Sequence, residues 1–256
     1  MLWHKSWLET RWRFAIGLAL IACSGVAVVL IYPSLQELVP TVVPPANANS
    51  ALAQKIRESA ELMRDYRGYV WSQWFDNKLM HAWALFAVLL GTGGLVSQAA
   101  RGGALFTLSL PVSRRRLVAV RAVTGLAELA VLAVVPSLLI VALSPAVGEH
   151  YAIGDALIHA GCMFVAGSVL FSLATLLSTV FGDIWRPLLI ALFAAVVLGL
   201  SEQLFHAVSR VSVFPVMSAE SYFRGDGLPW LRLVVCAVAS AVMLHGAAWN
   251  IRRQDF

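Results

Sequence analysis

The chain has 256 residues, of which 59% are hydrophobic and 13% are charged, and its formal net charge is +5. Soluble domains contain roughly 45–50% apolar residues, so this composition excludes an ordinary water-soluble fold. A spanning helix takes about 20 apolar residues, so the length accommodates about six spans and leaves no room for a large soluble catalytic domain.

The N-terminal residues 1–13 combine three tryptophans with three basic residues, a composition typical of a helix that lies at a membrane interface. The apolar run 14–32 follows them and is too long for the hydrophobic region of a signal peptide. We therefore expect an interfacial helix over 1–13 that enters the first spanning helix, 14–32, at an angle.

The segment 33–78 is the longest one between two apolar runs. Its four prolines predict a stiff, irregular start, and Ser50 suits the N-cap of a following helix. After Ser50, apolar residues recur at helical spacing among charged ones, which predicts an amphipathic helix in an extracytoplasmic loop. The aromatic residues between 69 and 75 then indicate either an aromatic belt at the outer interface or a substrate gate.

Five further apolar runs, separated by proline, glycine or charged residues, predict the remaining spans. These runs are 79–97, 117–143, 154–180, 188–206 and 230–249. The expected fold class is an all-α integral membrane protein with about six transmembrane helices, which form a single domain over residues 1–256.

The distribution of lysine and arginine sets the expected orientation. With the N-terminus in the cytoplasm, the inner segments hold eleven basic and three acidic residues, and the outer segments hold eight basic and ten acidic residues. Because cytoplasmic loops carry the excess of basic residues, we expect both termini in the cytoplasm. The basic residues flank apolar runs instead of forming one tract, so we expect membrane lipids and no nucleic acid as partners.

Motifs for catalysis and nucleotide binding are missing from the sequence. No G-x-x-x-x-G-K-[ST], H-E-x-x-H or G-x-S-x-G motif occurs in it. We therefore expect no ATP hydrolysis by the chain itself, no cofactor and no enzymatic activity of its own. Cys23, Cys162 and Cys236 lie in apolar runs without C-x-x-C spacing, so they are expected to be buried packing residues.

An ionisable residue inside a membrane span costs free energy, so Glu128 is a candidate for a functional role. It lies seven residues after Arg121, two helical turns along the same face of 117–143. We expect Arg121 to reach the cytoplasmic interface, which leaves Glu128 as a deep acid and a candidate intramembrane polar site. The alternative is a structural hydrogen bond to a neighbouring helix. His159 and His245 are expected to be packing residues.

The loop between the second and third spans, 97–116, reads SQAARGGALFTLSLPVSRRR. It has more apolar surface than a short cytoplasmic loop needs, and Pro111 ends any helix before the three arginines at 114–116. Such a loop is suited to docking a partner protein. The alternative is that it lies in the lipid headgroups with its arginines on phosphates.

This loop resembles the corresponding loop of ABC-2-type exporter permeases, in which a glycine-led short helix runs into an L-S-L-P-V-S-R segment, matched here from Leu108 to Arg114. The six-span plan, the interfacial N-terminal helix and the basic C-terminal tail extend the resemblance over most of the chain. Two positions depart from the family pattern, because Gln98 stands where the family often has Glu and Gly103 where it often has Thr. A neutral Gln hydrogen-bonds but forms no ion pair.

The resemblance implies a permease subunit of an ATP-driven exporter in the bacterial inner membrane, with a short cytoplasmic coupling helix between spans two and three. A separate ATP-binding subunit would hold ATP and Mg²⁺, and a second permease subunit, identical or homologous, would complete the path. The implied docking and coupling residues are Gln98, Arg101, Gly102, Leu105, Phe106, Leu108, Pro111, Arg114 and Arg115.

Other functions remain as alternatives at this stage. They are an ion-gradient-driven secondary transporter, a lipid-modifying intramembrane enzyme and a purely structural membrane subunit. An apolar path suits a drug, a peptide, a lipid or an ion alike, so the sequence does not name the substrate.

Overall fold

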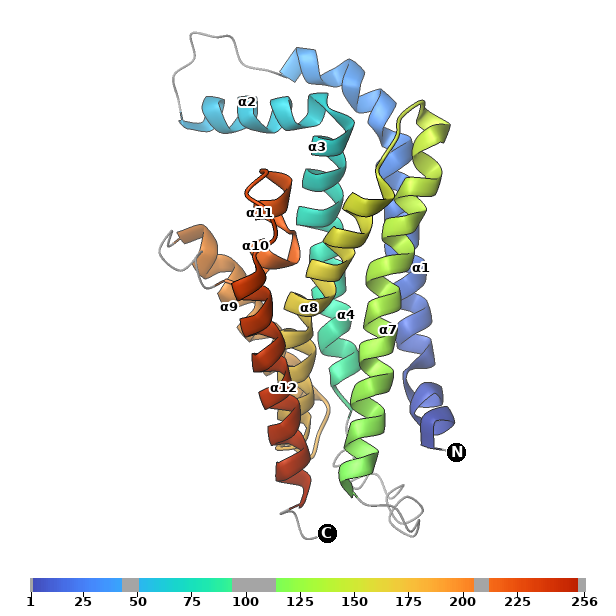
Figure 1. Ribbon diagram of the computed structural model, residues 1–256, viewed down its shortest axis with the longest axis vertical. Helices are drawn as coiled ribbons and strands as arrows, with labels where there is room; N and C mark the ends of the chain where they lie inside the picture. Colours follow the sequence, from blue (N-terminus) through green and yellow to red (C-terminus); the bar gives the residue numbers. More distant parts are fainter. Residues whose placement is uncertain (1, 43–50, 94–113, 205–211, 253–256) are drawn as a thin grey trace.

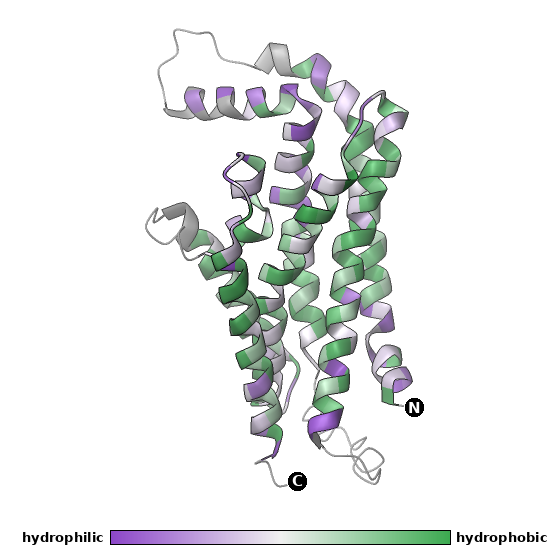
Figure 2. Ribbon diagram, viewed as in Figure 1, coloured by the Kyte–Doolittle hydropathy of each residue, from purple (hydrophilic) through white to green (hydrophobic). Residues whose placement is uncertain are grey.

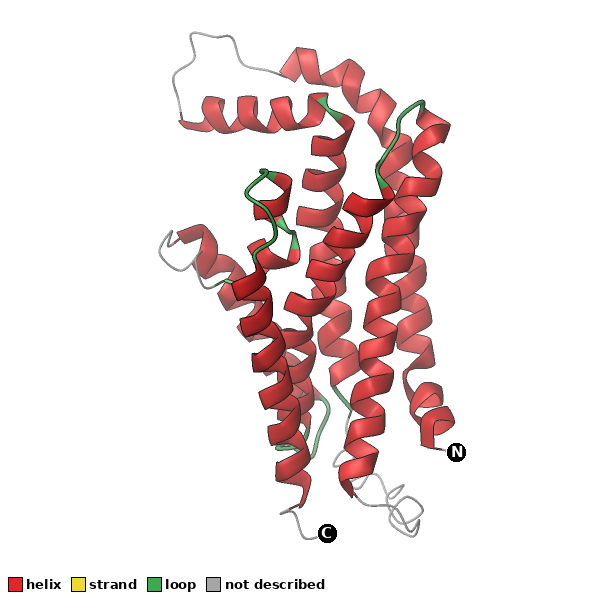
Figure 3. Ribbon diagram, viewed as in Figure 1, coloured by secondary structure: helices red, strands yellow, loops and turns green. Residues whose placement is uncertain are grey.

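The computed structural model describes residues 2–42, 51–93, 114–204 and 212–252. Within these ranges the chain forms helices joined by short loops, and no β-strand occurs there (Figure 3). In chain order the elements are α1 (Leu2–Val42), α2 (Ala51–Arg64), α3 (Tyr66–Val70), the π-helix η1 (Trp71–Lys78), α4 (Leu79–Gly91), α7 (Arg114–Leu143), the 3-10 turn η2 (Ser144–Val147), α8 (Ile153–Ser178), α9 (Trp185–Leu204), α10 (Phe214–Met217), α11 (Glu220–Phe223) and α12 (Trp230–Arg252).

The long helices form one elongated bundle (Figure 1). The first and last described residues, Leu2 and Arg252, lie at the same end of the bundle, which we call the basal end. The opposite, distal end holds α2, which lies across the direction of the long helices (Figure 1). Hydrophobic residues predominate along the middle of the bundle, whereas the coloured part of α2 is largely hydrophilic (Figure 2).

Four helices in the described part of the chain are long and apolar enough to cross a membrane. The segments that meet this description are Leu2–Leu38, Arg115–Val147, Ile153–Ser178 and Trp230–Arg252. The protein is therefore an all-α protein with the features of a membrane protein. The last three segments also lie close to the predicted spans 117–143, 154–180 and 230–249, because charged or turn-forming residues end each apolar run.

The first helix is longer than the sequence predicts. We expected a separate interfacial helix and an irregular stretch after residue 32, but α1 runs without a break from Leu2 to Val42, through Pro33. Proline removes the N–H that would bond to the Val29 carbonyl, a local loss that packing against other helices offsets. Tyr69 contributes to that packing, since its hydroxyl donates to the carbonyl of Val28 at 2.8 Å.

The predicted second span, 79–97, is misplaced at both ends. Helical structure already begins at Tyr66 and continues through α3, η1 and α4 to Gly91. The chain leaves the helix at Thr92, and Gly93 follows with a positive φ of 94°. A left-handed glycine is a common way to end a helix, because it has no Cβ to clash. Residues 94–97 lie outside the described ranges.

The predicted amphipathic helix is present as α2, but it ends earlier than its apolar spacing suggests. The helix stops at Arg64, and Asp65 starts a new one by accepting a hydrogen bond from the Gly68 N–H at 3.3 Å. Asp65 is extended, with φ −94° and ψ 132°, which is the usual N-cap conformation. The chain therefore turns at this residue from α2 into the bundle.

The core is built around α8, which packs against α4, α7 and α12. Gly167 of α8 lies directly against α4, since a Cβ atom at this position would lie 2.1 Å from the Trp83 ring. Only glycine allows the indole to approach this closely. Trp83 is fully buried, and its ring N–H donates to the Leu129 carbonyl of α7 at 3.1 Å. Gly167 and Trp83 thus join three helices.

Burial was predicted correctly for some cysteine and histidine residues and wrongly for others. Cys162, Cys236 and His159 are buried as expected. Cys23 is exposed, and so is His245, so both predictions are wrong. Cys23 lies on the outward stripe of α1 beside exposed leucines, where a free cysteine, which behaves as a small apolar residue, suits a lipid environment.

Candidate functional site at the basal end of α4

The last turn of α4 has carbonyl groups that its own helix cannot satisfy, as at any helix C-terminus. Thr92 satisfies two of them, because its N–H donates to the Val88 carbonyl at 3.1 Å and its hydroxyl donates to the Leu89 carbonyl at 3.0 Å. Thr92 itself is fully buried. This helix end directly precedes the segment 94–113, which contains most of the predicted coupling loop and lies outside the described ranges.

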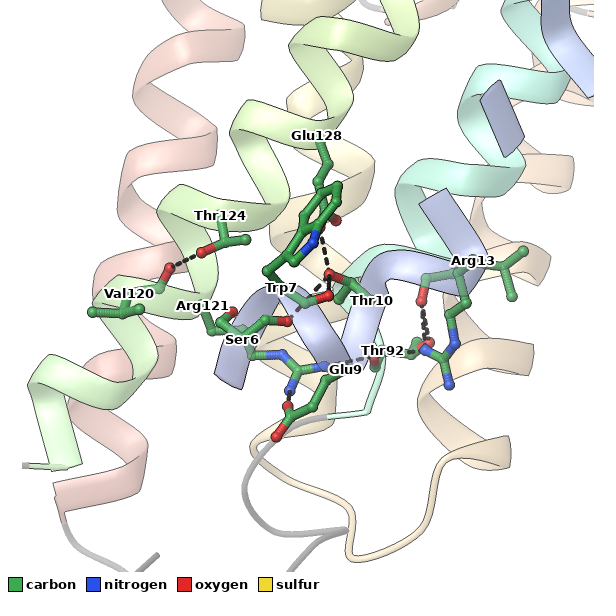
Figure 4. Close-up of polar contacts among 11 residues, drawn as sticks. Ser6, Trp7, Glu9, Thr10, Arg13, Thr92, Val120, Arg121, Thr124 and Glu128 are labelled. Carbon is green, nitrogen blue, oxygen red and sulfur yellow. Dashed lines mark hydrogen bonds and ion pairs between the residues drawn. The ribbon is translucent and has the colours of Figure 1, made fainter. Parts of the chain in front are cut away.

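Two arginines from other helices converge on this end (Figure 4). Arg13 of α1 donates to the carbonyls of Leu89 at 2.9 Å and Thr92 at 3.2 Å. Arg121 of α7 donates to the same Thr92 carbonyl at 3.0 Å. Cations are favourable at a helix C-terminus, where the helix dipole is negative. The two guanidinium groups therefore join α1, α4 and α7 at one carbonyl oxygen.

Gly93 makes room for this arrangement. A Cβ atom at this position would lie 3.3 Å from Nη2 of Arg121 and 3.5 Å from Nη1 of Arg13. The residue also has a positive φ of 94°, which side chains disfavour. A larger residue would have to adopt a strained backbone and would shift the end of the Arg121 side chain slightly.

The neighbouring charges are partly balanced by Glu9 of α1. Its Oε2 atom lies 3.2 Å from Nη1 of Arg121, and their side chains are 30% and 15% exposed. Arg121 therefore makes an ion pair with α1 and a hydrogen bond to α4. Both contacts hold the guanidinium group beside the end of α4, and the expected position of Arg121 at the cytoplasmic interface stays a prediction.

Glu128 lies deeper along α7 and is almost completely buried, with 3% of its surface exposed. Its Oε1 atom accepts a hydrogen bond from the Thr10 hydroxyl of α1 (Figure 4). The hydrogen bond to a neighbouring helix that the structural alternative predicts is therefore present, and the functional role of Glu128 stays a prediction. Its other oxygen, Oε2, has no hydrogen-bond partner among the described residues. The carboxyl group is therefore half satisfied.

The predicted docking residues are largely untested by the structure. Seven of them lie outside the described ranges, namely Gln98, Arg101, Gly102, Leu105, Phe106, Leu108 and Pro111. Arg114 is the first residue of α7, and Arg115 is exposed beside it. The structure shows in addition that the end of α4, which precedes the loop, is bonded to α1 and α7.

Sequence reasoning missed the roles of Arg13, Thr92 and Glu9. The composition of residues 1–13 identifies Arg13 only as one of three interfacial basic residues, and no sequence pattern assigns a role to Thr92 or Glu9. One signal could have pointed to the contact between Arg13 and the end of α4. A basic residue at the start of one apolar helix and the end of another helix on the same side of a membrane lie at the same depth.

Comparison with known proteins gives no match, whether to a family model, to a curated protein or to a solved structure. The described residues contain no group of three or more His, Cys, Asp or Glu side chains that could hold a metal ion. The interpretation of the site therefore depends on its own geometry. That geometry bonds the end of α4 to α1 and α7.

Replacing Arg121 with methionine should lower the free energy of unfolding by about 2 kcal/mol. The change removes one of the two donors to the buried Thr92 carbonyl, which keeps its bond to Arg13, and a partner of the partly exposed Glu9. A hydrogen bond from a charged donor contributes about 1.5–3 kcal/mol, and the partly exposed ion pair adds little. Unfolding of the purified protein by SDS in mixed micelles measures the effect. Arg115→Met, at an exposed position of the same helix, is the control and should change stability by less than about 0.5 kcal/mol. Equal effects of the two substitutions would contradict the role given to Arg121.

Proposed function

We propose that the chain is the transmembrane permease subunit of an ATP-driven exporter, without an ATPase of its own. In this proposal a separate ATP-binding subunit docks on the loop from Gln98 to Arg116. A second permease subunit, identical or homologous, completes the substrate path. The proposal concerns the bacterial inner membrane, with both termini in the cytoplasm.

The observation that carries the proposal is the attachment of the α4 end to two other helices. Arg13 and Arg121 both bond to the Thr92 carbonyl, and the docking loop begins a few residues later. A push on the loop would thus act on α1, α4 and α7 together. The energy of ATP binding in the partner would be converted into a rigid-body tilt of packed helices, which is a common form of conformational switching.

The six-span count requires two crossings besides the four apolar helices. The helical run from Tyr66 to Gly91 comprises 26 residues and α9 comprises 20 residues. At 1.5 Å per residue both runs reach about 30 Å, the thickness of the hydrocarbon layer. We propose them as the second and fifth spans.

The exposed apolar faces of α9 and α12 supply surface for lipid or for a second permease subunit. Phe193 of α9 and Leu231 of α12 are 70% and 79% exposed. Transmembrane helices associate without a hydrophobic driving force, through packing and interhelical hydrogen bonds.

The topology makes a direct prediction for two exposed positions. In a protein whose three native cysteines are replaced, a cysteine at Ser59 of α2 should react in intact cells with an impermeant thiol reagent. A cysteine at Arg115 should react only after the membrane is permeabilised, because basic segments stay in the cytoplasm. The native Cys23 has to be replaced first because it is exposed. Labelling of position 115 in intact cells, with position 59 protected, would overturn the proposed orientation.

A gradient-driven transporter is the second candidate, and the buried carboxyl group of Glu128 favours it. One oxygen of this carboxyl lacks a partner among the described residues, and intramembrane acids often carry protons or bind ions in such transporters. Measurement of ATPase activity and of ion-coupled uptake in the Glu128→Gln variant distinguishes the two candidate functions. In the exporter, the ATPase activity of the purified complex should stay within about twofold of wild type. In a gradient-driven transporter, no ATPase would be present and Glu128→Gln would abolish ion-coupled uptake.

A further inference from the structure

The helical run formed by α3, η1 and α4 changes in polarity along its accessible face. From Tyr66 to His81, every residue that is not buried is polar, and these residues are Arg67, Ser72, Gln73, Asp76, Asn77, Lys78 and His81. From Ala82 to Gly91, every residue that is not buried is apolar, and these residues are Ala82, Leu85 and Leu89. The accessible face is therefore polar in its distal part and apolar in its basal part.

The polar part of this face lies beside the middle of the first helix. A Cβ atom at Gly25 of α1 would lie 3.1 Å from the Trp74 ring, and one at Gly17 would lie 2.8 Å from the Phe86 ring. The residues between Trp74 and Phe86 therefore lie alongside the centre of the apolar run 14–32. That run is expected to cross the hydrocarbon layer, so the polar residues next to it lie at the same depth.

The length of the helix gives the same depth. His81 and Lys78 precede Gly91, where α4 ends, by 10 and 13 residues. These separations correspond to about 15 and 20 Å along the helix axis. The hydrocarbon layer is about 30 Å thick, so both residues lie well inside it in the proposed second span. A lysine can extend its long chain toward a membrane surface, but the side chains of Asn77 and His81 are too short to do so.

Lipid is an unfavourable neighbour for such a face. Ionisable side chains at this depth cost free energy in hydrocarbon, and they almost always face the bundle interior or a water-filled cavity. Asn77, Lys78 and His81 are exposed, so they do not face the interior of this chain. Nδ1 of His81 donates to the Asn77 carbonyl of its own helix at 2.7 Å, which leaves Nε2 as the ring atom that can bond to water. Water therefore suits this face better than lipid.

The exposed surfaces around the polar face are apolar. Leu85, one turn basal to His81, is 42% exposed, and Phe193 of α9 and Leu231 of α12 are 70% and 79% exposed. These side chains suit contact with lipid. The polar face begins near the distal end at Arg67, whose side chain is 46% exposed. Water on this face would thus be continuous with the distal side of the membrane and would end above Leu85.

The charges on this face indicate which solutes it binds. Lys78 is exposed and lies deeper than Arg67, whereas Asp76 is only partly exposed. A charge at the bottom of a cavity with low-dielectric walls attracts the opposite charge more strongly than it would in bulk water. The amide of Asn77 and the ring of His81 add hydrogen-bonding groups beside the ammonium group. This combination suits a hydrophilic solute that carries an acidic group.

We infer that the polar face from Arg67 to His81 lines a water-filled vestibule that opens at the distal end, ends above Leu85 and binds hydrophilic solutes through an acidic group at Lys78. The inference names a substrate class for the path and rests on the second span of the proposed function. It does not depend on the ATP-binding partner. The distal half of the path is then hydrophilic, and a substrate without polar groups would not be favoured there.

Cysteine labelling of the full-length protein in lipid nanodiscs tests the vestibule, because the reagent then reaches both sides of the membrane. In a background without native cysteines, separate proteins carry Asn77→Cys, His81→Cys, Leu85→Cys or Leu231→Cys. Because the thiolate is the reactive form and is disfavoured in apolar surroundings, a charged methanethiosulfonate should react at positions 77 and 81 about tenfold faster than at positions 85 and 231. Leu85 and Leu231 are the matched controls, since both are exposed and apolar.

The substitution Lys78→Gln tests the preference for an acidic group, because it removes the charge and keeps a polar side chain. The rates of an anionic and a cationic methanethiosulfonate are measured at His81→Cys and divided by their rates at the exposed Ser59→Cys. The resulting anion-to-cation ratio should fall about threefold, the effect of one unit charge several ångströms away in water. Arg64→Gln, at an exposed position of α2, is the control and should leave the ratio unchanged.

The other outcomes each overturn a defined part of the inference. Protection of positions 77 and 81 to the same extent as 85 and 231 would show that lipid or a second subunit covers the face, and the vestibule would be wrong. Fast labelling at 77, 81 and 85, with 231 protected, would show that this run does not cross the membrane, and the proposed second span would fail with the vestibule. An unchanged ratio in Lys78→Gln would rule out the preference for an acidic group. The expected labelling in a protein that binds no ATPase would support the vestibule and contradict the exporter alone.

Discussion

A valine at Gly167 should lower the free energy of unfolding by about 3 kcal/mol. A Cβ atom there would lie 2.1 Å from the Trp83 ring, so the indole has to move. Overpacking of this kind costs about 1–3 kcal/mol. The movement also breaks the bond from the Trp83 ring N–H to the Leu129 carbonyl, and an unsatisfied buried group adds about 1–3 kcal/mol. Unfolding by SDS in mixed micelles measures the loss.

Gly161 provides a matched control on the same helix. A Cβ atom at Gly161 would meet no atom within 4 Å, so valine fits there without displacing a neighbour. We expect Gly161→Val to change the stability by less than about 0.5 kcal/mol. If both valine variants are equally destabilised, the effect comes from helix backbone preferences, and the account of the Gly167–Trp83 contact is wrong.

Alanine at Phe106 should weaken binding of the ATP-binding partner about 30-fold. In the proposed function, Phe106 is the aromatic anchor of the docking loop, and such anchors commonly carry about 2 kcal/mol or more of binding free energy. Arg114→Ala should weaken binding about fivefold or less, because an exposed charge contributes about 1 kcal/mol at most. The measurement is co-purification with the ATPase and its activity in lipid.

Ala99→Ser is the control for the loop, since it changes polarity in the same segment without removing an anchor. The fold of the membrane domain should be intact in all three variants, which size-exclusion chromatography in detergent checks. Wild-type binding and ATPase coupling in the Phe106→Ala protein would remove Phe106 from the role of anchor. The apolar residues around Phe106 could then still dock the partner, and replacement of residues 105–110 tests that role.

The parts of the fold that were predictable are those fixed by local sequence. The spans 117–143, 154–180 and 230–249 match α7, α8 and α12 closely, because a helix in lipid has to satisfy its backbone groups internally and an apolar run can be little else. The passage of α1 through Pro33 and the early start of the second helical run were not predictable. Both depend on contacts with other helices, such as the bond from Tyr69 to Val28.

The candidate site was predictable only in part. The cost of burying Glu128 identified it as a residue that needs a partner, and a hydrogen bond across helices was one of the two alternatives. The partner, Thr10, lies 118 residues away in sequence, and the Arg13 contact with Thr92 spans 79 residues. Periodicity within one helix carries no information on such pairs. They follow from which helices pack together and at what depth.

The most direct test of the proposed function is purification of the tagged full-length chain from its native membrane in mild detergent. The matched comparison is a protein in which residues 105–110 are replaced by glycine and serine. The proposal predicts that an ATP-binding-cassette ATPase co-purifies with the wild-type chain and is lost from the loop variant, while both proteins remain folded. Recovery of the wild-type chain without an ATPase, or equal recovery of the ATPase with both proteins, would contradict it.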